Sequence, residues 1–453
     1  FPSLVSSITL TRIRRELLPN DTDTTGPPIG SSAFSPTPED YDRDFQHLSQ
    51  LCEFFHAQPP PHGTTFFSTS LGGACHLRWE RHTEAQTYTF TRTATDDELS
   101  HPFSDTAVSM NLLPKAWLSN VPGFVLSGIH VAMTEHVPSD FASITKYFHR
   151  EAGVVTGCSV DQGRFRVYSD WRQHSDGFGR ILIHAMPEDT APNRRTAAGK
   201  VLQRMVEVDK YRALALLAQP YAQRLTPRVD ALGAQLMAVT EAMHAVEEED
   251  NAEGRQTGAT WTQLELSRQR ELLNRLCTLS AEGLKLSSSS SFRFSASAAY
   301  AQIVDDRMAF LQMERIEGLP SMATFISQAV HPAVRTADAI SARLEKLRTA
   351  MTHTADLLRT GLTVQQQAAN IRELEELQSN AKIQLKLQES VEGLSVVAIT
   401  YYSTGVVGYV AKAADKLGYL PVPPEVALGM SVPLIAVSVY VGLHHLKKSA
   451  TGH

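Results

Sequence analysis

The stretch LSVVAITYYSTGVVGYVA at residues 394–411 contains no charged side chain, and none occurs anywhere between Glu392 and Lys412. A second apolar stretch, VALGMSVPLIAVSVYVGL, follows at residues 426–443. A bilayer core about 30 Å thick needs roughly 20 helical residues, which both stretches approach. The pair predicts a C-terminal hairpin of two transmembrane helices, Leu394–Ala411 and Val426–Leu443. Two buried core helices are the alternative for runs this short.

The charges around the two stretches predict an orientation. Lys412 and Lys416 in the connecting segment are balanced by Asp415 and Glu425, so this loop has no net charge. Lysines also precede the first stretch and follow the second. Two spans place both ends on one side, and the positive-inside rule predicts that the bulk of the chain and both termini lie on the cytoplasmic or matrix side.

The two stretches contain small and polar residues that bear on how the helices associate. Thr404 and Gly408 are four positions apart, as are Ser438 and Gly442. Small residues at this spacing let two helices approach closely. The pattern predicts helix packing in the membrane, and a polar pore lining stays open as the alternative. The candidate residues for either role are Ser403, Thr404, Gly405, Gly408, Ser438 and Gly442.

Upstream of residue 394 the chain divides into four further parts. Pro, Gly, Ser and Thr crowd residues 22–38, which predicts a flexible segment over residues 1–40. Residues 41–192 carry a helical pattern followed by strand patterns, and predict an antiparallel α/β domain. Residues 193–331 predict a helical hairpin domain with a loop at Ser287–Ser291. Residues 332–393 predict a long stalk helix, and residues 394–448 the two spans.

Two strands of the α/β domain are predicted in register. Gln86–Arg92 alternates, with Tyr88 and Phe90 on one face and threonines on the other. His76–Arg81 places Leu77 and Trp79 in the same register, which predicts a hairpin. The fold class expected for the whole chain is α+β.

Apolar residues in the stalk follow a coiled-coil-like spacing that needs a partner helix. This partner lies either in the same chain or in another subunit, and both arrangements can occur together. The residues are Ile340, Leu344, Leu347, Met351, Thr354 and Leu358, then Ala368, Ile371, Leu374, Leu377 and Ala381.

Composition limits the class of protein. Apolar residues make up 42% and charged residues 20%, which is ordinary for a folded chain. The net charge of −6 argues against a broad nucleic-acid-binding surface. The four cysteines lie far apart without a Cys/His cluster, which predicts free thiols rather than a zinc site.

No GxGxxG, Walker A, HExxH or GxSxG motif is present, so the sequence predicts no cofactor, no metal and no catalytic residue. The densest polar patch is Glu80, Arg81, His82 and Glu84. Its carboxylates and imidazole have the chemistry of an acid–base or metal site. A solvated face of a strand is the favoured interpretation, and a hydrolase using Glu80, His82 and Glu84 is the third functional hypothesis.

Several stretches resemble those of a known family. They include Leu77–Glu84, Gly179–Ile183, Glu314–Leu319 and above all VEGLSVVAITYY at residues 391–402. In these the chain resembles the membrane-anchored proteins grouped as domain of unknown function 3422, over roughly Glu53 to Lys448. The resemblance implies an inner-membrane protein and no particular activity. The family's opening Glu-Leu-His-Ala-Arg-Pro-like segment is kept only in part, at Glu16–Pro19, which points to an organellar version.

A weaker similarity is architectural. An α/β domain, a stalk and a two-span hairpin also describe the CorA-type magnesium channels, although their Gly-Met-Asn motif is missing after the first span. The leading hypothesis is an oligomeric scaffold or accessory subunit of a mitochondrial or bacterial inner-membrane assembly, whose partners are lipid, further copies or other membrane proteins. A CorA-like homo-oligomeric ion channel is the alternative.

Overall fold

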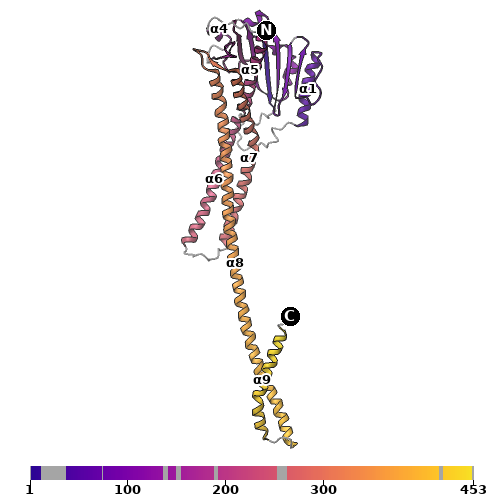
Figure 1. Ribbon diagram of the computed structural model, residues 1–453, viewed down its shortest axis with the longest axis vertical. Coiled ribbons are helices and arrows are strands. Elements are labelled where there is room, and N and C mark those ends of the chain that lie inside the picture. The colour runs from indigo at the N-terminus through magenta and orange to yellow at the C-terminus, as the bar shows by residue number, and fades with distance from the viewer. Residues whose placement is uncertain are drawn as a thin grey trace. The chain divides into compact units, whose positions relative to one another are not determined.

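The computed structural model describes residues 2–11, 37–73, 75–135, 141–148, 155–187, 192–252, 263–417 and 422–450. The fold is α+β, as expected, with a nine-stranded sheet and long helices (Figure 1). The chain divides into two compact units. Unit 1 comprises Phe1–Asp250 and Ser267–Leu358, and unit 2 comprises Asn251–Leu266 and Arg359–His453.

The sheet belongs to unit 1, with the strand order β2-β3-β4-β1-β5-β8-β7-β6-β9. Neighbouring strands are antiparallel except β5 and β8, which are parallel, so the expected antiparallel layer is in fact a mixed sheet. The strands are β1 (Ser3–Thr11), β2 (Phe66–Leu71), β3 (Cys75–Arg81), β4 (Ala85–Thr93), β5 (Phe124–Thr134), β6 (Thr156–Val160), β7 (Phe165–Ser169), β8 (Gly179–Ala185) and β9 (Glu314–Arg315).

The hairpin predicted from alternation is confirmed. Strands β3 and β4 pair so that Leu77 lies opposite Phe90 and Trp79 lies opposite Tyr88. These four side chains are fully buried in one cluster beneath helix α1 (Pro38–Phe54). Period-2 alternation therefore identified both the register and the buried face.

The expectation of a flexible segment over residues 1–40 is wrong for its first part. Residues 12–36 lie outside the described residues, but β1 lies between β4 and β5. Its polar side chains are paired across the sheet: Ser6 Oγ lies 2.9 Å from His130 Nδ1, and Ser7 Oγ lies 3.0 Å from Thr89 Oγ1. Serines and threonines made the segment resemble a linker, whereas long-range pairing makes it a central strand.

Helices cover both faces of the sheet. Helix α1 begins with a capping box in which the Thr37 and Asp40 side chains bond each other's backbone N–H groups, and it packs on one face. Helix α5 packs on the other through Val201 and Met205, together with parts of α7 and α8. The helices are α2 (Asp96–Ser100), η3 (Ser109–Leu112), α3 (Lys115–Ser119), α4 (Phe141–Thr145), α5 (Arg194–Leu216), α6 (Ala218–Ala252), α7 (Gln263–Leu311), α8 (Met322–Lys416) and α9 (Pro424–Ala450).

Two predicted breaks in the helical region do not occur. Ser287–Ser291 lies within α7, not in a loop, and two of its serines are buried there. Hydroxyls of this run bond back to the carbonyls of Lys285 and Leu286, so their polar groups are satisfied within the helix. The boundary expected before Pro332 lies inside α8. At both places tertiary packing outweighs the local preference of serine or proline for a break in the helix.

The two halves of the predicted seam in α8 have different surroundings. In unit 1, Ile340, Leu344, Met351 and Leu358 are buried in a cluster with α6 and α7. In unit 2, Ile371, Leu374 and Leu377 are 57%, 64% and 59% exposed. The first half therefore packs within the chain, and the second half presents apolar side chains at the surface of unit 2.

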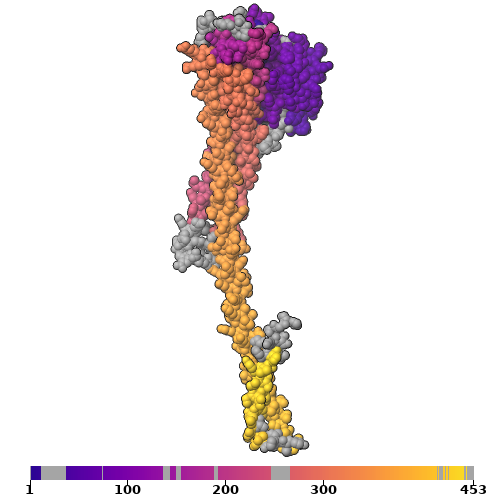
Figure 2. All heavy atoms as spheres, viewed as in Figure 1, coloured from indigo at the N-terminus to yellow at the C-terminus, as the bar shows by residue number. Residues whose placement is uncertain are grey.

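Unit 2 contains the apolar C-terminal helices, which are drawn in orange to yellow in the space-filling view (Figure 2). Among the described residues, one helix, α8, is long and apolar enough to cross a membrane by length and composition, and none of its apolar window is buried. A shorter apolar stretch, Leu428–Gly442, lies in α9.

Candidate functional site

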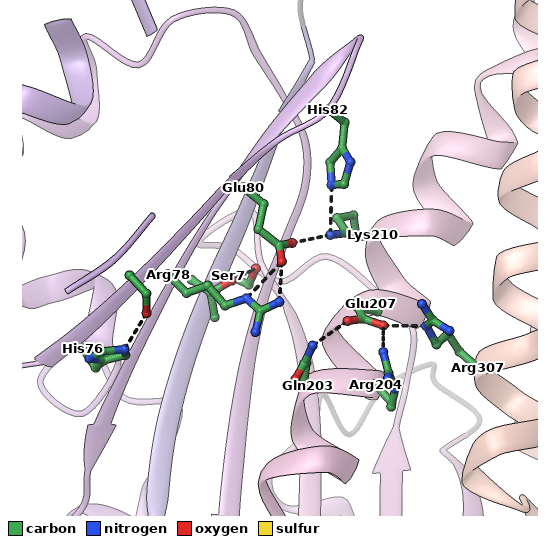
Figure 3. Close-up of polar contacts among 12 residues, drawn as sticks. Ser7, His76, Arg78, Glu80, His82, Gln203, Arg204, Glu207, Lys210 and Arg307 are labelled. Atoms are coloured by element: carbon green, nitrogen blue, oxygen red, sulfur yellow. Dashed lines mark hydrogen bonds and ion pairs between the residues drawn. The ribbon is translucent and has the colours of Figure 1, made fainter. Parts of the chain in front are cut away.

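The polar patch predicted from the sequence lies at the end of the β3–β4 hairpin in unit 1, and its Glu80 and His82 lie beside α5 (Figure 3). Strand alternation separates its members. Glu80 lies on the face toward α5, where it meets Lys210. Arg81 lies on the opposite face, with its guanidinium 4.3 Å from the ring centre of Tyr41 in α1. The four neighbouring polar residues therefore do not form one site.

Lys210 of α5 joins two of the predicted residues. Its Nζ donates to Glu80 Oε2 at 2.7 Å and lies 3.3 Å from His82 Nε2 (Figure 3). The side chain of Lys210 is only 3% exposed. Arg78 donates to the other oxygen of Glu80 through Nε at 3.0 Å. Glu80 is thus held by two cations from two different elements.

This arrangement sets the protonation states of the cluster. Burial would raise the pKa of Glu80, but Lys210 and Arg78 outweigh it and lower that pKa to about 2. Burial, assisted by the nearby Lys210 ammonium, lowers the pKa of His82. Glu80 is therefore ionised and His82 neutral at pH 7. A carboxylate held this firmly in its ionised form is a poor proton donor.

Glu84 belongs to a separate ion pair. Arg293 of α7 donates to it through both terminal nitrogens, with Nη2 lying 2.7 Å from Oε1, and each side chain is only 1% exposed. Burial and the neighbouring Glu84 carboxylate raise the pKa of Tyr300, also in α7. Glu80 and Glu84 thus bind different cations. Among the described residues, no group of three His, Cys, Asp or Glu side chains is placed to hold a metal ion.

A third cluster, around Glu207, links α5 to α7. Glu207 accepts hydrogen bonds from Gln203, Arg204 and Arg307, the last at 2.6 Å from α7 (Figure 3). Burial opposes ionisation of Glu207, but these donors lower its pKa. The three clusters together join the hairpin, α5 and α7 through charge-assisted bonds.

The geometry of these clusters favours a structural role, in which the ion pairs hold the hairpin, α5 and α7 together; we call this set of ion pairs the brace. Each carboxylate binds one cation from a neighbouring element: Glu80 binds Lys210, Glu84 binds Arg293 and Glu207 binds Arg307. Sequence reasoning missed Lys210 and Arg293, which lie 130 and 209 positions from their acceptors. The available signal was the run Glu207, Asp209 and Lys210 among buried valines, since charged residues on an apolar helix face need buried counterions.

The family described as Protein of unknown function (DUF3422) matches residues 28–450. The chain belongs to the DUF3422 family. The match contains every described element except β1, which precedes it. No curated protein matches the chain.

The candidate membrane residues of this DUF3422 chain fall into two groups in unit 2. Thr404, Gly405 and Gly408 of α8 line a groove of about 910 Å³ that Leu428 and Val432 of α9 also line. Gly408 has the tightest contact, because a Cβ placed on it would lie 3.0 Å from a methyl of Leu428.

The remaining candidates do not make this contact. Ser403 is half-buried and does not line the groove, while Ser438 and Gly442 of α9 are exposed. Nothing lies within 4 Å of a Cβ placed on Gly405 or Gly442. The pair Thr404 and Gly408 therefore faces α9, and the pair Ser438 and Gly442 faces outward.

Proposed function

We propose that the chain is a membrane-anchored, oligomeric scaffold or accessory subunit of an inner-membrane assembly, held by two spans. The observation that carries this proposal is the apolar window of α8, which is long enough to span a bilayer and has no buried residue. Large side chains there are exposed, including Val397 at 67% and Val406 at 63%. A contiguous exposed apolar surface of this kind needs lipid or protein to cover it.

The second proposed span is α9. Its 27 residues make a helix about 40 Å long, and its apolar part exposes Leu434 and Val437 at 71% and 62%. The charge-free run between Glu425 and His444 supports the same location. Pro433 inside this helix is tolerated in membrane spans, where neighbouring groups satisfy the freed carbonyl.

The hydroxyl groups of the first span support packing rather than a pore. Ser395, Thr400 and Thr404 each bond the carbonyl four residues earlier in α8, at 2.7 to 2.8 Å. Hydroxyls used in this way need no water. The close approach of Gly408 to Leu428 adds a contact between the two helices, as small residues allow.

Self-association is proposed through α8 in unit 2. Ile371, Leu374, Ala381 and Leu385 share one side of the helix by their spacing, and the three large side chains among them are 57%, 64% and 61% exposed. A second copy brings the same apolar surface, which is what an isologous two-fold contact requires. Charged residues such as Arg372 and Glu376 alternate with the apolar side chains, as beside a coiled-coil seam.

The location proposed is the inner membrane of a mitochondrion or bacterium, with the bulk of the chain on the matrix or cytoplasmic side. The lysines outside the spans, and the uncharged balance of the loop between them, support this orientation. Nothing in the geometry favours the ion channel or the hydrolase over the scaffold.

The anchor can be tested by alkaline extraction and labelling. Full-length protein should stay in the membrane pellet after carbonate washing. A single cysteine introduced at residue 422 in a variant without native cysteines should be labelled by an impermeant maleimide from the side opposite to a cysteine at residue 386. Release by carbonate, or labelling of both positions from one side, would contradict the two-span anchor.

Self-association needs a separate, matched test. Leu374→Ser removes an apolar side chain from the proposed contact, whereas Ile383→Ser removes one from the opposite side of the same helix. In mild detergent, native mass spectrometry should show a loss of oligomer for Leu374→Ser and no change for Ile383→Ser. A monomeric wild-type chain, or equal effects of the two changes, would refute the assignment.

A further inference from the structure

A cavity of about 360 Å³ opens in unit 1, away from the brace around Lys210. Its walls are the first half of β5, the segment that leads from β7 into β8, and the C-terminal half of α5. This volume lies at the lower end of the range for ligand pockets, about 300–1,000 Å³. The space therefore suits a small molecule rather than a dinucleotide or a peptide.

The charges of the cavity wall are strongly unbalanced. Three arginines line it, Arg172, Arg180 and Arg212, against a single carboxylate, Asp209. Both oxygens of Asp209 are occupied: Ser127 donates to Oδ2, and Arg212 donates to Oδ1 at 2.8 Å. The wall keeps two positive charges that its own residues do not neutralise.

Two of these arginines also keep unsatisfied donors. The Nε atoms of Arg180 and Arg212 are buried, and no described residue offers either of them a hydrogen-bond acceptor. Arg180 donates through Nη1 to the carbonyl of Tyr147 at 3.3 Å. Asp176, Asp170 and Asp105 lie near enough to favour its charged form, but among the described residues none of the three bonds directly to its guanidinium. Buried donors are normally satisfied, and an acceptor bound in the cavity would satisfy these two.

An aromatic side chain is held rigidly at the same wall. Trp171 has a φ of 53°, a left-handed backbone conformation that is costly for so bulky a residue. Its indole Nε1 donates to Thr156 Oγ1 at 2.9 Å, its ring stacks on Phe325, and the guanidinium of Arg212 lies 5.0 Å from a ring centre. Strain of this kind is retained where the surroundings fix a side chain for a purpose.

Apart from Ser127, Ser169 and Gln173, the rest of the wall is apolar. It includes Leu126, Ile129 and Ile181 from the sheet and Leu216 and Leu217 from the end of α5. Guanidinium groups bind carboxylate and phosphate oxygens in pairs, while an indole and aliphatic side chains bury a hydrocarbon part. We propose that this cavity binds a small organic anion, with a carboxylate or phosphate head on the arginines and a short apolar body against Trp171.

The proposal is tested by calorimetric titration of the full-length protein in detergent with three anions: succinate, phenyl phosphate and inorganic phosphate. Benzyl alcohol serves as the neutral probe. At least one organic anion should bind more tightly than benzyl alcohol. The difference in affinity between phenyl phosphate and inorganic phosphate measures the contribution of the apolar wall. Comparison of succinate with phenyl phosphate separates a carboxylate from a phosphate head.

Three variants locate the binding. Arg172→Gln and Arg180→Gln each remove one wall charge and should weaken binding about 10- to 100-fold, the effect of losing a charge-assisted hydrogen bond. Arg195→Gln is the matched control, because Arg195 is exposed on α5 and does not line the cavity. It should leave the affinity within about twofold.

Two results would overturn the proposal. One is the failure of the wild-type chain to bind any of the three anions at about 10 mM. The other is binding that Arg172→Gln and Arg195→Gln weaken equally, which would place the anion elsewhere. Arg172 is exposed, so its replacement decides the question even where Arg180→Gln fails to fold.

Discussion

Replacing Arg293 by methionine should be among the most destabilising single changes in unit 1. Arg293 and Glu84 are each 1% exposed and joined by two hydrogen bonds, so the change leaves a buried carboxylate without its counterion. Removing one member of such a pair costs about 3–5 kcal/mol. We therefore expect a loss of about 3–5 kcal/mol for Arg293→Met.

The assay is guanidinium unfolding followed by tryptophan fluorescence, since Trp79 and Trp117 are both buried in unit 1. The double variant with Glu84→Gln added should regain at least about 2 kcal/mol, because no charge is then left buried. Arg343→Met is the control: Arg343 and its acceptor Asp230 are 52% and 51% exposed, and such a pair contributes about 0–1 kcal/mol. A loss below about 1 kcal/mol for Arg293→Met, or a double variant no more stable than the single one, would refute the reasoning.

Three further predictions concern pH and packing. The Glu80 carboxyl has a pKa of about 2, below its unfolded value, so unfolding free energy should rise by about 3 kcal/mol between pH 2 and 4.5, and Glu80→Gln should remove this slope in denaturation series. Burial lowers the pKa of His47 to about 4, which is also below its unfolded value, so wild-type stability should fall as the pH drops from about 6.5 to 4. His47→Gln should remove this dependence of the unfolding free energy on pH, and an unchanged dependence would exclude His47 as its source. Gly408→Val should disturb the contact with Leu428 by about 1–3 kcal/mol in detergent unfolding, while Gly405→Val, with open space around its Cβ, should not, and equal effects would contradict this contact.

Short-range sequence patterns predicted the helices and strands whose hydrophobic periodicity can be seen in neighbouring residues. The β3–β4 hairpin followed from alternation alone, because Leu77, Trp79, Tyr88 and Phe90 repeat every second residue. The α+β class and the long helices followed from the change of period along the chain. The family also followed from short stretches, and the match over residues 28–450 confirms it.

Local patterns misled where distant residues decide the outcome. β1 is rich in serine and threonine, and it is a central strand only because β4 and β5 supply its hydrogen bonds. The serines at Ser287–Ser291 lie in a helix because the surrounding bundle packs around it and buries two of them. In both cases packing outweighs intrinsic propensity, which amounts to only tenths of a kcal/mol per residue.

The sequence by itself determined the class of fold, the two apolar stretches at residues 394–411 and 426–443, and the family, because each depends on composition and short-range spacing. Only the tertiary structure decided which polar residues meet. It separated Glu80 from Glu84, assigned them to Lys210 and Arg293, and gathered Arg172, Arg180 and Arg212 around one cavity. The reason is physical: a buried charge is stabilised by whichever counterion the fold brings within about 3 Å, and separation along the chain does not enter that energy.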